Sequence, residues 1–342
     1  MALNIIRATD AVKVTILKVL LYGQPGLGKT SLAFTCNAPL CLDFDKGAYR
    51  SKQRKDALDI GTWSDVVELM RTPAALAPYQ TIIVDTVGRC LDELTRHILA
   101  ESPKLGNRNG NLSLQGYGEL KSIFQSWMRQ LTLLGKDVVM ICHDKEEKDG
   151  DRVFKRPDVV GGSLSEVLKI SDIIGYLSMK NNKAVLDFTP TDDYVAKDAA
   201  QLKSFALPDF NEHPNFGARM LTKAKEEMSS LSGKVAEAAD MIEQWRTAID
   251  GCSTTDGCDA ALRQIGTLPA ELAGQIKVLL NNRVKALGFA YNADTKEFYK
   301  PEPPAAYSEP APSSVPTPQP ASVQPQPLAS SVMRNGKAAF SF

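Results

Sequence analysis

The chain has 342 residues, which is enough for one large or two modest domains with a sizeable core. Its 40 basic and 40 acidic residues give a formal net charge of zero, so any binding to nucleic acid or to an anionic membrane must come from a local patch. There is no long apolar run and no charged-then-apolar leader pattern, so we expect no membrane association and a cytoplasmic protein. The six cysteines lack a zinc spacing and are expected to remain free thiols.

The most informative motif is GQPGLGKT at residues 23–30, a complete G-x-x-x-x-G-K-[ST] phosphate-binding loop (P-loop). The apolar residues 16–22 before it predict a buried strand, and residues 31–34 after it open a helix. The glycines let successive backbone N–H groups turn inward and form a cradle for an anion. The residues that we expect to hold the phosphates of a nucleotide are Gly23, Gln24, Pro25, Gly26, Leu27, Gly28, Lys29, Thr30 and Ser31.

Two side chains of this loop and one further carboxylate have predicted catalytic or metal-binding roles. Lys29 would reach the β- and γ-phosphates, and the Thr30 hydroxyl would ligate Mg²⁺. Asp85 closes the apolar strand 81–85 and is the natural second Mg²⁺ ligand. The alternative for Asp85 is a capping aspartate before the turn that follows.

Strand and helix patterns alternate along the first two thirds of the chain. This alternation predicts a doubly wound α/β domain with a mainly parallel sheet, in which ligands bind at the carboxyl ends of the strands. We expect strands at 16–22, 39–45, 81–85, 137–143, 171–179 and 184–189, and helices at 63–70, 90–100 and 117–134.

Asp45 and His143 each end a predicted strand and complete the set of candidate catalytic residues. Asp45 is the first choice for the base that polarises the attacking water, with Asp43 and Asp65 behind it. A polar turn would explain the same aspartates. His143 would sense the γ-phosphate by hydrogen bonding, or it is a histidine satisfied locally at the mouth of the site.

Two loops are candidates for contact with single-stranded DNA. The segment 144–162 is dense in both charges, and the segment 101–116 combines basic residues with glycine and asparagine. Basic side chains next to an aromatic ring can bind phosphates and stack on a base. Solvated surface is the alternative for both loops. The candidate DNA contacts are Lys104, Arg108, Arg152, Phe154, Lys155 and Arg156.

The composition changes after the α/β region, which we assign to residues 1–210. Residues 211–300 are rich in helical patterns and predict a helical extension containing a small helical hairpin. Ten of the 20 prolines lie in residues 301–327, and we expect the whole segment 301–342 to be an extended, disordered tail. The basic and aromatic tip at 333–342 is a docking peptide or a frayed terminus.

Several stretches together resemble a known family: GQPGLGKTS at 23–31, LDFDKG at 42–47, TIIVDTVG at 81–88, VVMICHDKEEKDGD at 138–151, and RPDVVGG followed by SDIIGYL. They are similar to phage-encoded nucleotide-binding proteins of the AAA family, including the RecA-like ATPases of phage recombination modules known as the Sak-type annealing proteins. The resemblance covers roughly residues 12–210. Thr86 stands where many AAA+ ATPases have glutamate, which is closer to a RecA-like arrangement.

This resemblance implies a RecA-like fold, ATP and Mg²⁺ as cofactors, and catalysis with Lys29, Thr30 and Asp85 in the roles given above. It makes His143 a sensor and the two charged loops contacts for single-stranded DNA. A homo-oligomer, a single-strand-binding or annealing protein as partner, and the cytoplasm of a phage host are further implications. No strongly basic stripe is visible, so the prediction of DNA binding rests on the two loops alone.

Three functions are compatible with these features. The first is an ATPase that acts on single-stranded DNA in phage recombination or replication. The second is a nucleotide-dependent switch or adaptor that hydrolyses ATP slowly and recruits a partner through its helical region and tail. The third is a small-molecule kinase, which ranks last because kinases of this fold usually add an arginine-rich lid, and residues 152–156 are the only candidate for one.

Overall fold

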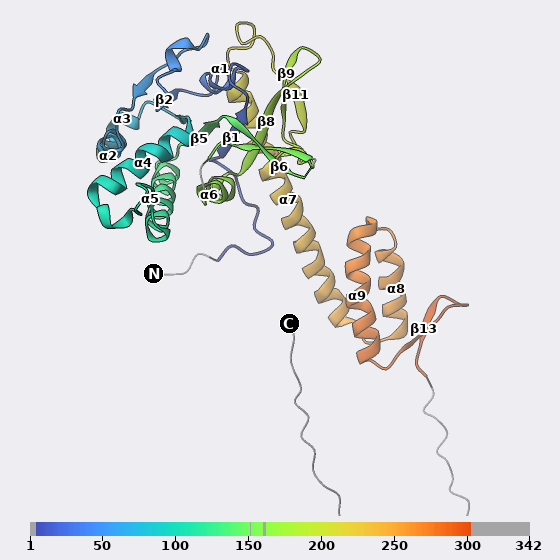
Figure 1. The fold of residues 1–342 in the computed structure, drawn as a ribbon. Helices are drawn as coiled ribbons and strands as arrows, with labels where there is room; N and C mark the ends of the chain where they lie inside the picture. The colour runs from blue at the N-terminus through green and yellow to red at the C-terminus, as the bar shows by residue number, and fades with distance from the viewer. Residues whose placement is uncertain (1–4, 151, 160–161, 302–342) are drawn as a thin grey trace, which may run out of the picture.

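The computed structural model describes residues 5–150, 152–159 and 162–301 (Figure 1). Its centre is a nine-stranded sheet in which β10 (Lys197–Asp198) pairs only with β8. The other strands run in the order β11 (Ser204–Ala206), β9 (Lys183–Asp187), β8 (Ile173–Lys180), β1 (Lys18–Gly23), β5 (Asp137–Cys142), β4 (Thr81–Asp85), β2 (Pro39–Asp43) and β3 (Ala57–Asp59).

Six neighbouring strands of this sheet, from β8 to β3, are parallel, and the antiparallel β9, β10 and β11 extend one side. The register places Tyr22 beside Cys142 and Asp43 beside Asp85, so the carboxyl ends of the central strands lie at one edge. One strand, β5, separates the P-loop strand β1 from the strand that ends in Asp85. The predicted fold class, an α/β core with a mainly parallel sheet, is confirmed.

Helices cover both faces of the sheet because the buried strands are apolar on both faces. In β1, Leu20 and Tyr22 belong to the core under one group of helices, whereas Val19 and Leu21 belong to the core on the opposite face. The first face carries α2 (Trp63–Arg71), α3 (Pro73–Leu76), α4 (Val87–Glu101), α5 (Leu114–Leu133) and α6 (Ser163–Ile170), and the second carries α1 (Lys29–Phe34) and the start of α7 (Phe216–Gly251).

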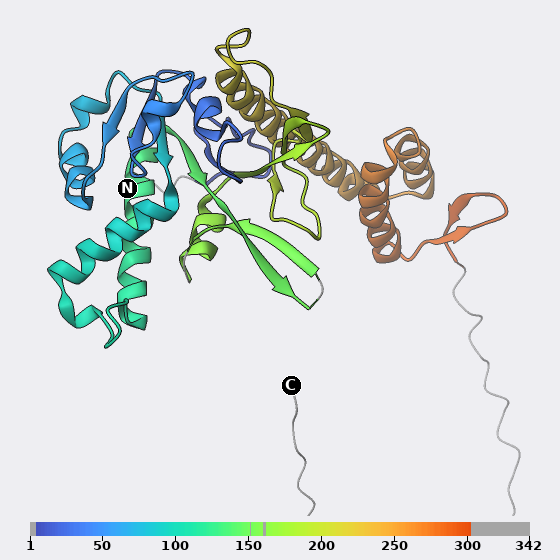
Figure 2. The ribbon, with the colours of Figure 1, turned by 45° about the horizontal axis from the view of Figure 1, so that its top comes forward.

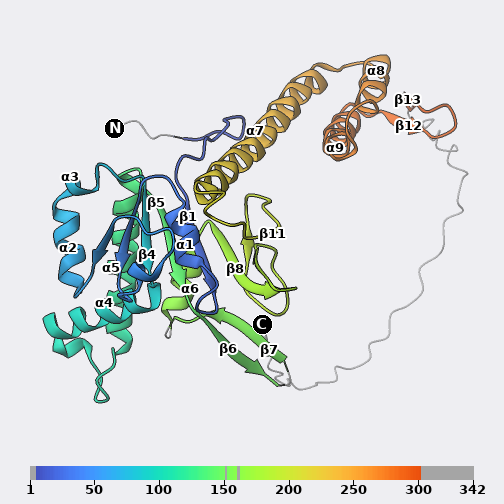
Figure 3. The same cartoon turned by 90° about the horizontal axis from the view of Figure 1, so that it is seen from above.

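Two segments project beyond the carboxyl edge of the sheet (Figure 3). One is the hairpin of β6 (Asp144–Asp149) and β7 (Arg152–Pro157), which Figure 2 shows extending well clear of the sheet. The other is the connection between α4 and α5, which contains the short 3-10 helix η2 (Pro103–Leu105). A second 3-10 helix, η1 (Ala48–Arg50), follows β2.

The C-terminal region leaves the α/β core along α7, a continuous helix of 36 residues. Its first turn is held to the end of α1, where the Gly217 N–H donates to the Thr35 hydroxyl and the Ala218 N–H to the Thr35 carbonyl. Farther along, Lys225 forms a 2.7 Å ion pair with Asp137. The far end of α7 packs with α8 (Thr255–Ile265), α9 (Ala270–Ala286) and the hairpin of β12 (Ala290–Asn292) and β13 (Glu297–Tyr299) around a separate apolar core.

The predicted strands and long helices are all present, with shifted boundaries. The second strand ends at Asp43 instead of residue 45, because the Asp43 carboxylate accepts the backbone N–H groups of Gly47 and Ala48 and turns the chain there. The predicted helical extension is present as α7, α8 and α9. The predicted tail, apart from Pro301, lies outside the described residues. None of the described helices is long and apolar enough to cross a membrane.

Candidate nucleotide-binding site

A cavity of about 630 Å³ lies at the carboxyl edge of the parallel strands. Residues 25–31 of the P-loop line it. Four residues from strand ends or the segments that follow them also line it: Asp45, Asp85, Ile141 and His143. Two loop segments, residues 50–53 and 208–211, belong to the same lining. The volume falls within the range typical of small-molecule sites.

The P-loop backbone turns sharply around this cavity. Gly26 and Gly28 have φ angles of 80° and 92°, in the left-handed region that only glycine enters without strain. Lys29 follows directly, is 5% exposed, and donates two 2.7 Å hydrogen bonds to the carbonyls of Gly23 and Gln24. Burial lowers the pKa of Lys29, while the nearby Asp85 opposes that effect. The lysine is therefore held in place by the loop that would hold the phosphates.

Thr30 and Asp85 form the candidate metal site. The Thr30 hydroxyl donates a 2.7 Å hydrogen bond to Oδ2 of Asp85. Asp85 is 6% exposed, and burial raises the pKa of its carboxyl group to about 6, with smaller contributions in both directions from neighbouring groups. A hydroxyl and a carboxylate in contact are oxygen donors of the kind Mg²⁺ prefers. The residues present therefore fit this ion.

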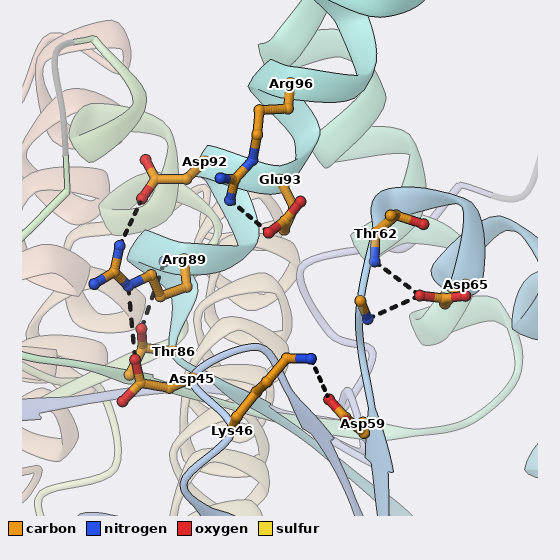
Figure 4. Close-up of polar contacts among 11 residues, drawn as sticks. Asp45, Lys46, Asp59, Thr62, Asp65, Thr86, Arg89, Asp92, Glu93 and Arg96 are labelled. Atoms are coloured by element: carbon orange, nitrogen blue, oxygen red, sulfur yellow. Dashed lines mark hydrogen bonds and ion pairs between the residues drawn. The ribbon is translucent and has the colours of Figure 1, made fainter.

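Asp45 is brought to the cavity as predicted, but it has a partner that the sequence did not indicate. Its Oδ1 lies 3.6 Å from Nε of Arg89, in the first turns of α4 (Figure 4). The same guanidinium lies 3.7 Å from Asp92, so Arg89 stands between two carboxylates. Asp45 therefore lines the cavity, and Arg89, which does not line it, partly balances the negative charge of Asp45.

The two reserve candidates for the catalytic base are not at the cavity. Asp43 is 6% exposed and uses both carboxylate oxygens to hold the N–H groups of Gly47 and Ala48. Asp65 accepts hydrogen bonds from the N–H groups of Gly61 and Thr62 at the start of α2 (Figure 4). Both aspartates are thus explained by the local turns that they stabilise.

His143 lines the cavity directly after β5. Its Nδ1 atom is buried and has no hydrogen-bond partner among the described residues. Burial lowers the pKa of this imidazole, and the positive charge of Lys29 lowers it further. The lowered pKa favours the neutral form of the ring.

The β6–β7 hairpin carries three of the six candidate DNA contacts in described positions. Lys155 pairs with Glu146 across the hairpin, and Nε of Arg156 lies 2.9 Å from the carboxylate of Glu147. The Arg156 guanidinium also covers the Phe154 ring, at 5.0 Å from its centroid. A DNA strand binding here must therefore displace acidic partners before it reaches these side chains.

The remaining candidate DNA contacts are separate from the cavity. Lys104 and Arg108 are exposed on the connection between α4 and α5. Arg152 begins β7, and its side chain lies outside the described part of the chain. Neither Lys104 nor Arg108 lines the cavity, although their segment projects from the same edge of the sheet as the hairpin (Figure 3).

Sequence reasoning missed the lining residues 50–53 and 208–211. Gln53 donates a 3.0 Å hydrogen bond from Nε2 to Oδ1 of Asn211, which joins two loops 158 residues apart. No motif marks either loop. It also missed Arg89, for which the only signal was its position four residues after Asp85.

The AAA domain family matches residues 15–200, more than half of the chain. The chain belongs to this family. Its AAA domain contains the P-loop, Asp45, Asp85 and His143, so the whole cavity apart from residues 208–211 lies in the matched region. The C-terminal helices lie outside it.

One curated relative and one solved structure illustrate how far this AAA domain resembles known proteins. The SPbeta prophage-derived uncharacterized protein YorG of Bacillus subtilis (strain 168) is 26% identical over 204 residues, which cover 56% of this chain and 62% of that protein. This chain therefore spans less than two thirds of that relative's length. The crystal structure of the KaiC-like protein PH0186 from Pyrococcus horikoshii OT3 aligns at 12% identity over 60% of this chain and 96% of that chain, with a TM-score of 0.34.

Proposed function

We propose that this protein is a Mg²⁺-dependent ATPase of the Sak-type, RecA-like group that acts on single-stranded DNA in phage recombination or replication. One observation carries the ATPase part of this proposal. Lys29 and the hydrogen-bonded pair of Thr30 and Asp85 line one cavity of sufficient volume, in a chain with an AAA domain. These groups supply the cation and the oxygen donors that phosphoryl transfer requires.

Each residue has a defined part in hydrolysis of ATP to ADP and phosphate. Lys29 exchanges its hydrogen bonds to the Gly23 and Gln24 carbonyls for bonds to phosphate oxygens. Thr30 and Asp85 would hold Mg²⁺, which would supply positive charge to balance the phosphates. Asp45 accepts the proton of the attacking water. The imidazole of His143, which lines the cavity, then bonds the terminal phosphate and reports its loss.

The DNA part of the proposal is supported by where the charged segments lie. The β6–β7 hairpin begins one residue after His143 and projects from the edge that holds the cavity (Figure 3). A change at the terminal phosphate therefore acts directly on the segment that carries Phe154, Lys155 and Arg156. The prophage origin of the YorG relative supports the phage context. We further propose a homo-oligomer and an annealing or single-strand-binding protein as partner.

A second candidate function is a nucleotide-dependent switch, and the attachment of α7 favours it. Thr35, which directly follows α1, holds the first turn of α7 through two hydrogen bonds. A movement of the P-loop would therefore be passed through α1 to the C-terminal helices. In this case ATP turnover would be slow and indifferent to DNA.

The test is ATP hydrolysis by the full chain, with and without single-stranded DNA, in wild type and in Lys29→Ala. Lys234→Ala is the matched control, because Lys234 is exposed on α7 and distant from the cavity. DNA-stimulated hydrolysis that is lost only in Lys29→Ala supports the proposed function. Slow hydrolysis that DNA does not stimulate favours the switch. Absence of ATP binding in the wild type contradicts both.

A further inference from the structure

An apolar groove of about 440 Å³ lies between α2 and α5, on the face of the sheet opposite α7. Trp63 and Trp127 line it, and their rings meet edge to face with centroids 5.2 Å apart. Val67, Met70 and Ile123 also line it and are only half-buried. The groove therefore presents aromatic and aliphatic side chains that packing within the chain leaves partly open to solvent.

The groove has the length of a short peptide and a positive charge at one end. Its lining runs along α2 from Trp63 to Arg71 and along α5 from Ser122 to Gln130, about 12 Å on each helix. The charged residue of this lining is Arg71, which is exposed and is the last residue of α2.

A segment of the same chain, outside the described residues, carries a matching pattern. Residues 309–318 read EPAPSSVPTP. Prolines favour the polyproline II helix, in which every third residue lies on the same edge because one turn takes three residues. One such edge carries Glu309, Pro312, Val315 and Pro318, spaced about 9 Å apart at a rise of 3.1 Å per residue. This edge is apolar and begins with a carboxylate.

The groove and the segment agree in length and in charge. Pro312 and Val315 together cover about 9 Å, which fits within the groove. Glu309 lies one turn farther along the same edge, where Arg71 can pair with it through a charge-assisted hydrogen bond. Proline-rich segments bind aromatic-lined grooves well because their extended conformation is largely formed before binding, so little entropy is lost.

The position of Pro301 indicates which copy supplies the segment. The C-terminal core and the α2–α5 layer lie at opposite ends of the molecule (Figure 1, Figure 3). About 39 Å of α7 separates Phe216 from Ile242, where the helix begins to pack with the C-terminal core. The chain from Pro301 to Glu309 spans at most about 29 Å. It is therefore too short to bring Glu309 back to Arg71 of the same copy.

We propose that the groove between α2 and α5 binds residues 309–318 of a second copy of this chain. Pro312 and Val315 pack against the apolar lining, and Glu309 pairs with Arg71. This contact goes beyond the proposed function, because the groove shares no lining residue with the nucleotide cavity.

The first test measures the binding of a fluorescent peptide of residues 306–322 to the full chain carrying Val315→Asp, whose own segment no longer competes. The wild-type peptide should bind. A Val315→Asp peptide should bind at least tenfold more weakly, whereas Thr317→Asp adds the same charge on a different edge and should bind like wild type. Equal affinities of the two variant peptides, or no binding of the wild-type peptide, would overturn the proposal.

A charge exchange tests the register of the segment. Arg71→Glu in the same receptor should weaken binding of the wild-type peptide at least threefold, and a Glu309→Arg peptide should restore it. Arg129→Glu is the matched control, since Arg129 is exposed on α5 but does not line the groove. Failure of the Glu309→Arg peptide to recover affinity for Arg71→Glu would contradict the pairing.

Sedimentation velocity of the full chain at several concentrations tests the second copy. Val315→Asp should lower the association constant at least tenfold relative to wild type, and Thr317→Asp should leave it unchanged. Peptide binding combined with equal association of wild type and Val315→Asp would mean that the segment occupies the groove of its own chain, which would overturn the proposal. ATP hydrolysis by Val315→Asp should equal that of wild type, so a failure here leaves the proposed function standing.

Discussion

The Thr30 hydroxyl and the Asp85 carboxylate are joined by a 2.7 Å hydrogen bond between residues 55 positions apart in the chain. The two residues come from opposite sides of β5, since the P-loop follows β1 and Asp85 ends β4. The contact therefore spans the central strand of the sheet. It also holds a carboxylate in a buried place where its charged form is disfavoured.

Asp85→Asn should stabilise the nucleotide-free protein. The pKa of the Asp85 carboxyl group is 3.8 in the unfolded chain and about 6 in the folded protein. The protonated carboxyl group therefore stabilises the fold fully below about pH 4, and this stabilisation is lost as the pH rises through 6. At pH 7.5 the substitution should raise the free energy of unfolding by about 2–3 kcal/mol. Urea unfolding of both proteins measures this difference.

The pH dependence separates this cause from a change in packing. The gain from Asp85→Asn should shrink to less than about 1 kcal/mol at pH 4, because the folded carboxyl group is then protonated and the unfolded one is only partly ionised. The same variant should lose Mg²⁺-dependent nucleotide binding, because it lacks the charged ligand. A gain that stayed constant from pH 4 to 7.5 would contradict the raised pKa.

Asp45→Asn should slow ATP hydrolysis by about 10²- to 10⁴-fold, the usual contribution of a positioned base. The affinity for ATP should change little, because the carboxylate acts on water. Asp92→Asn is the matched control: Asp92 pairs with the same Arg89 at a similar distance but does not line the cavity. Steady-state kinetics measures the hydrolysis rate, and equilibrium titration measures the affinity for ATP. Similar small losses of rate in Asp45→Asn and Asp92→Asn would show that Asp45 does not act as the base.

Arg156→Ala should weaken the binding of single-stranded DNA and reduce the dependence of log affinity on log salt by about 0.7, the value for one phosphate contact. Arg246→Ala is the control, since Arg246 also pairs with a glutamate but lies on α7. Fluorescence anisotropy at several salt concentrations gives both slopes. Equal slopes for wild type and Arg156→Ala would show that this side chain does not contact the phosphates.

Gly217→Ala should destabilise the protein by about 1–3 kcal/mol through overpacking. A Cβ atom there would lie 2.8 Å from the Leu32 carbonyl, the Thr35 hydroxyl and the Cys36 sulfur. Gly233→Ala, in the same helix but facing open space, should instead stabilise by about 0.5–1 kcal/mol. Thermal and urea unfolding measure the loss of stability in Gly217→Ala and the gain in Gly233→Ala. An unchanged stability of Gly217→Ala would show that α7 does not pack tightly against α1.

The parts of the fold that could be predicted are those with strong local patterns. The continuous apolar runs of β1, β4 and β5 and the P-loop spacing located the centre of the sheet and the P-loop lining of the cavity. The short strands β3, β10 and β11 were missed because two or three residues carry no measurable period. Their places in the sheet are set by pairing with distant strands.

The part of the cavity lining formed by residues 50–53 and 208–211 was beyond prediction for a similar reason. Gln53 and Asn211 are ordinary surface amides in the sequence, and only the folded chain brings them within hydrogen-bond distance. The role of Asp43 was also hidden, because an aspartate that holds a turn and an aspartate that activates water look alike in a polar segment. Asp45 differs from Asp43 because Asp45 lines the cavity, and only the folded structure shows this difference.

The length of α7 has a geometric consequence. A helix of 36 residues is about 54 Å long, and its first turn is anchored at Thr35, six residues after Lys29. Lys225 is also held by Asp137, and about 39 Å of the helix remains beyond it. If this remaining part moves as a rigid rod, a tilt of 5° displaces its far end by about 3 Å. The α8–α9 unit therefore sits where a small angular change at the surface of the core becomes a displacement of about 3 Å.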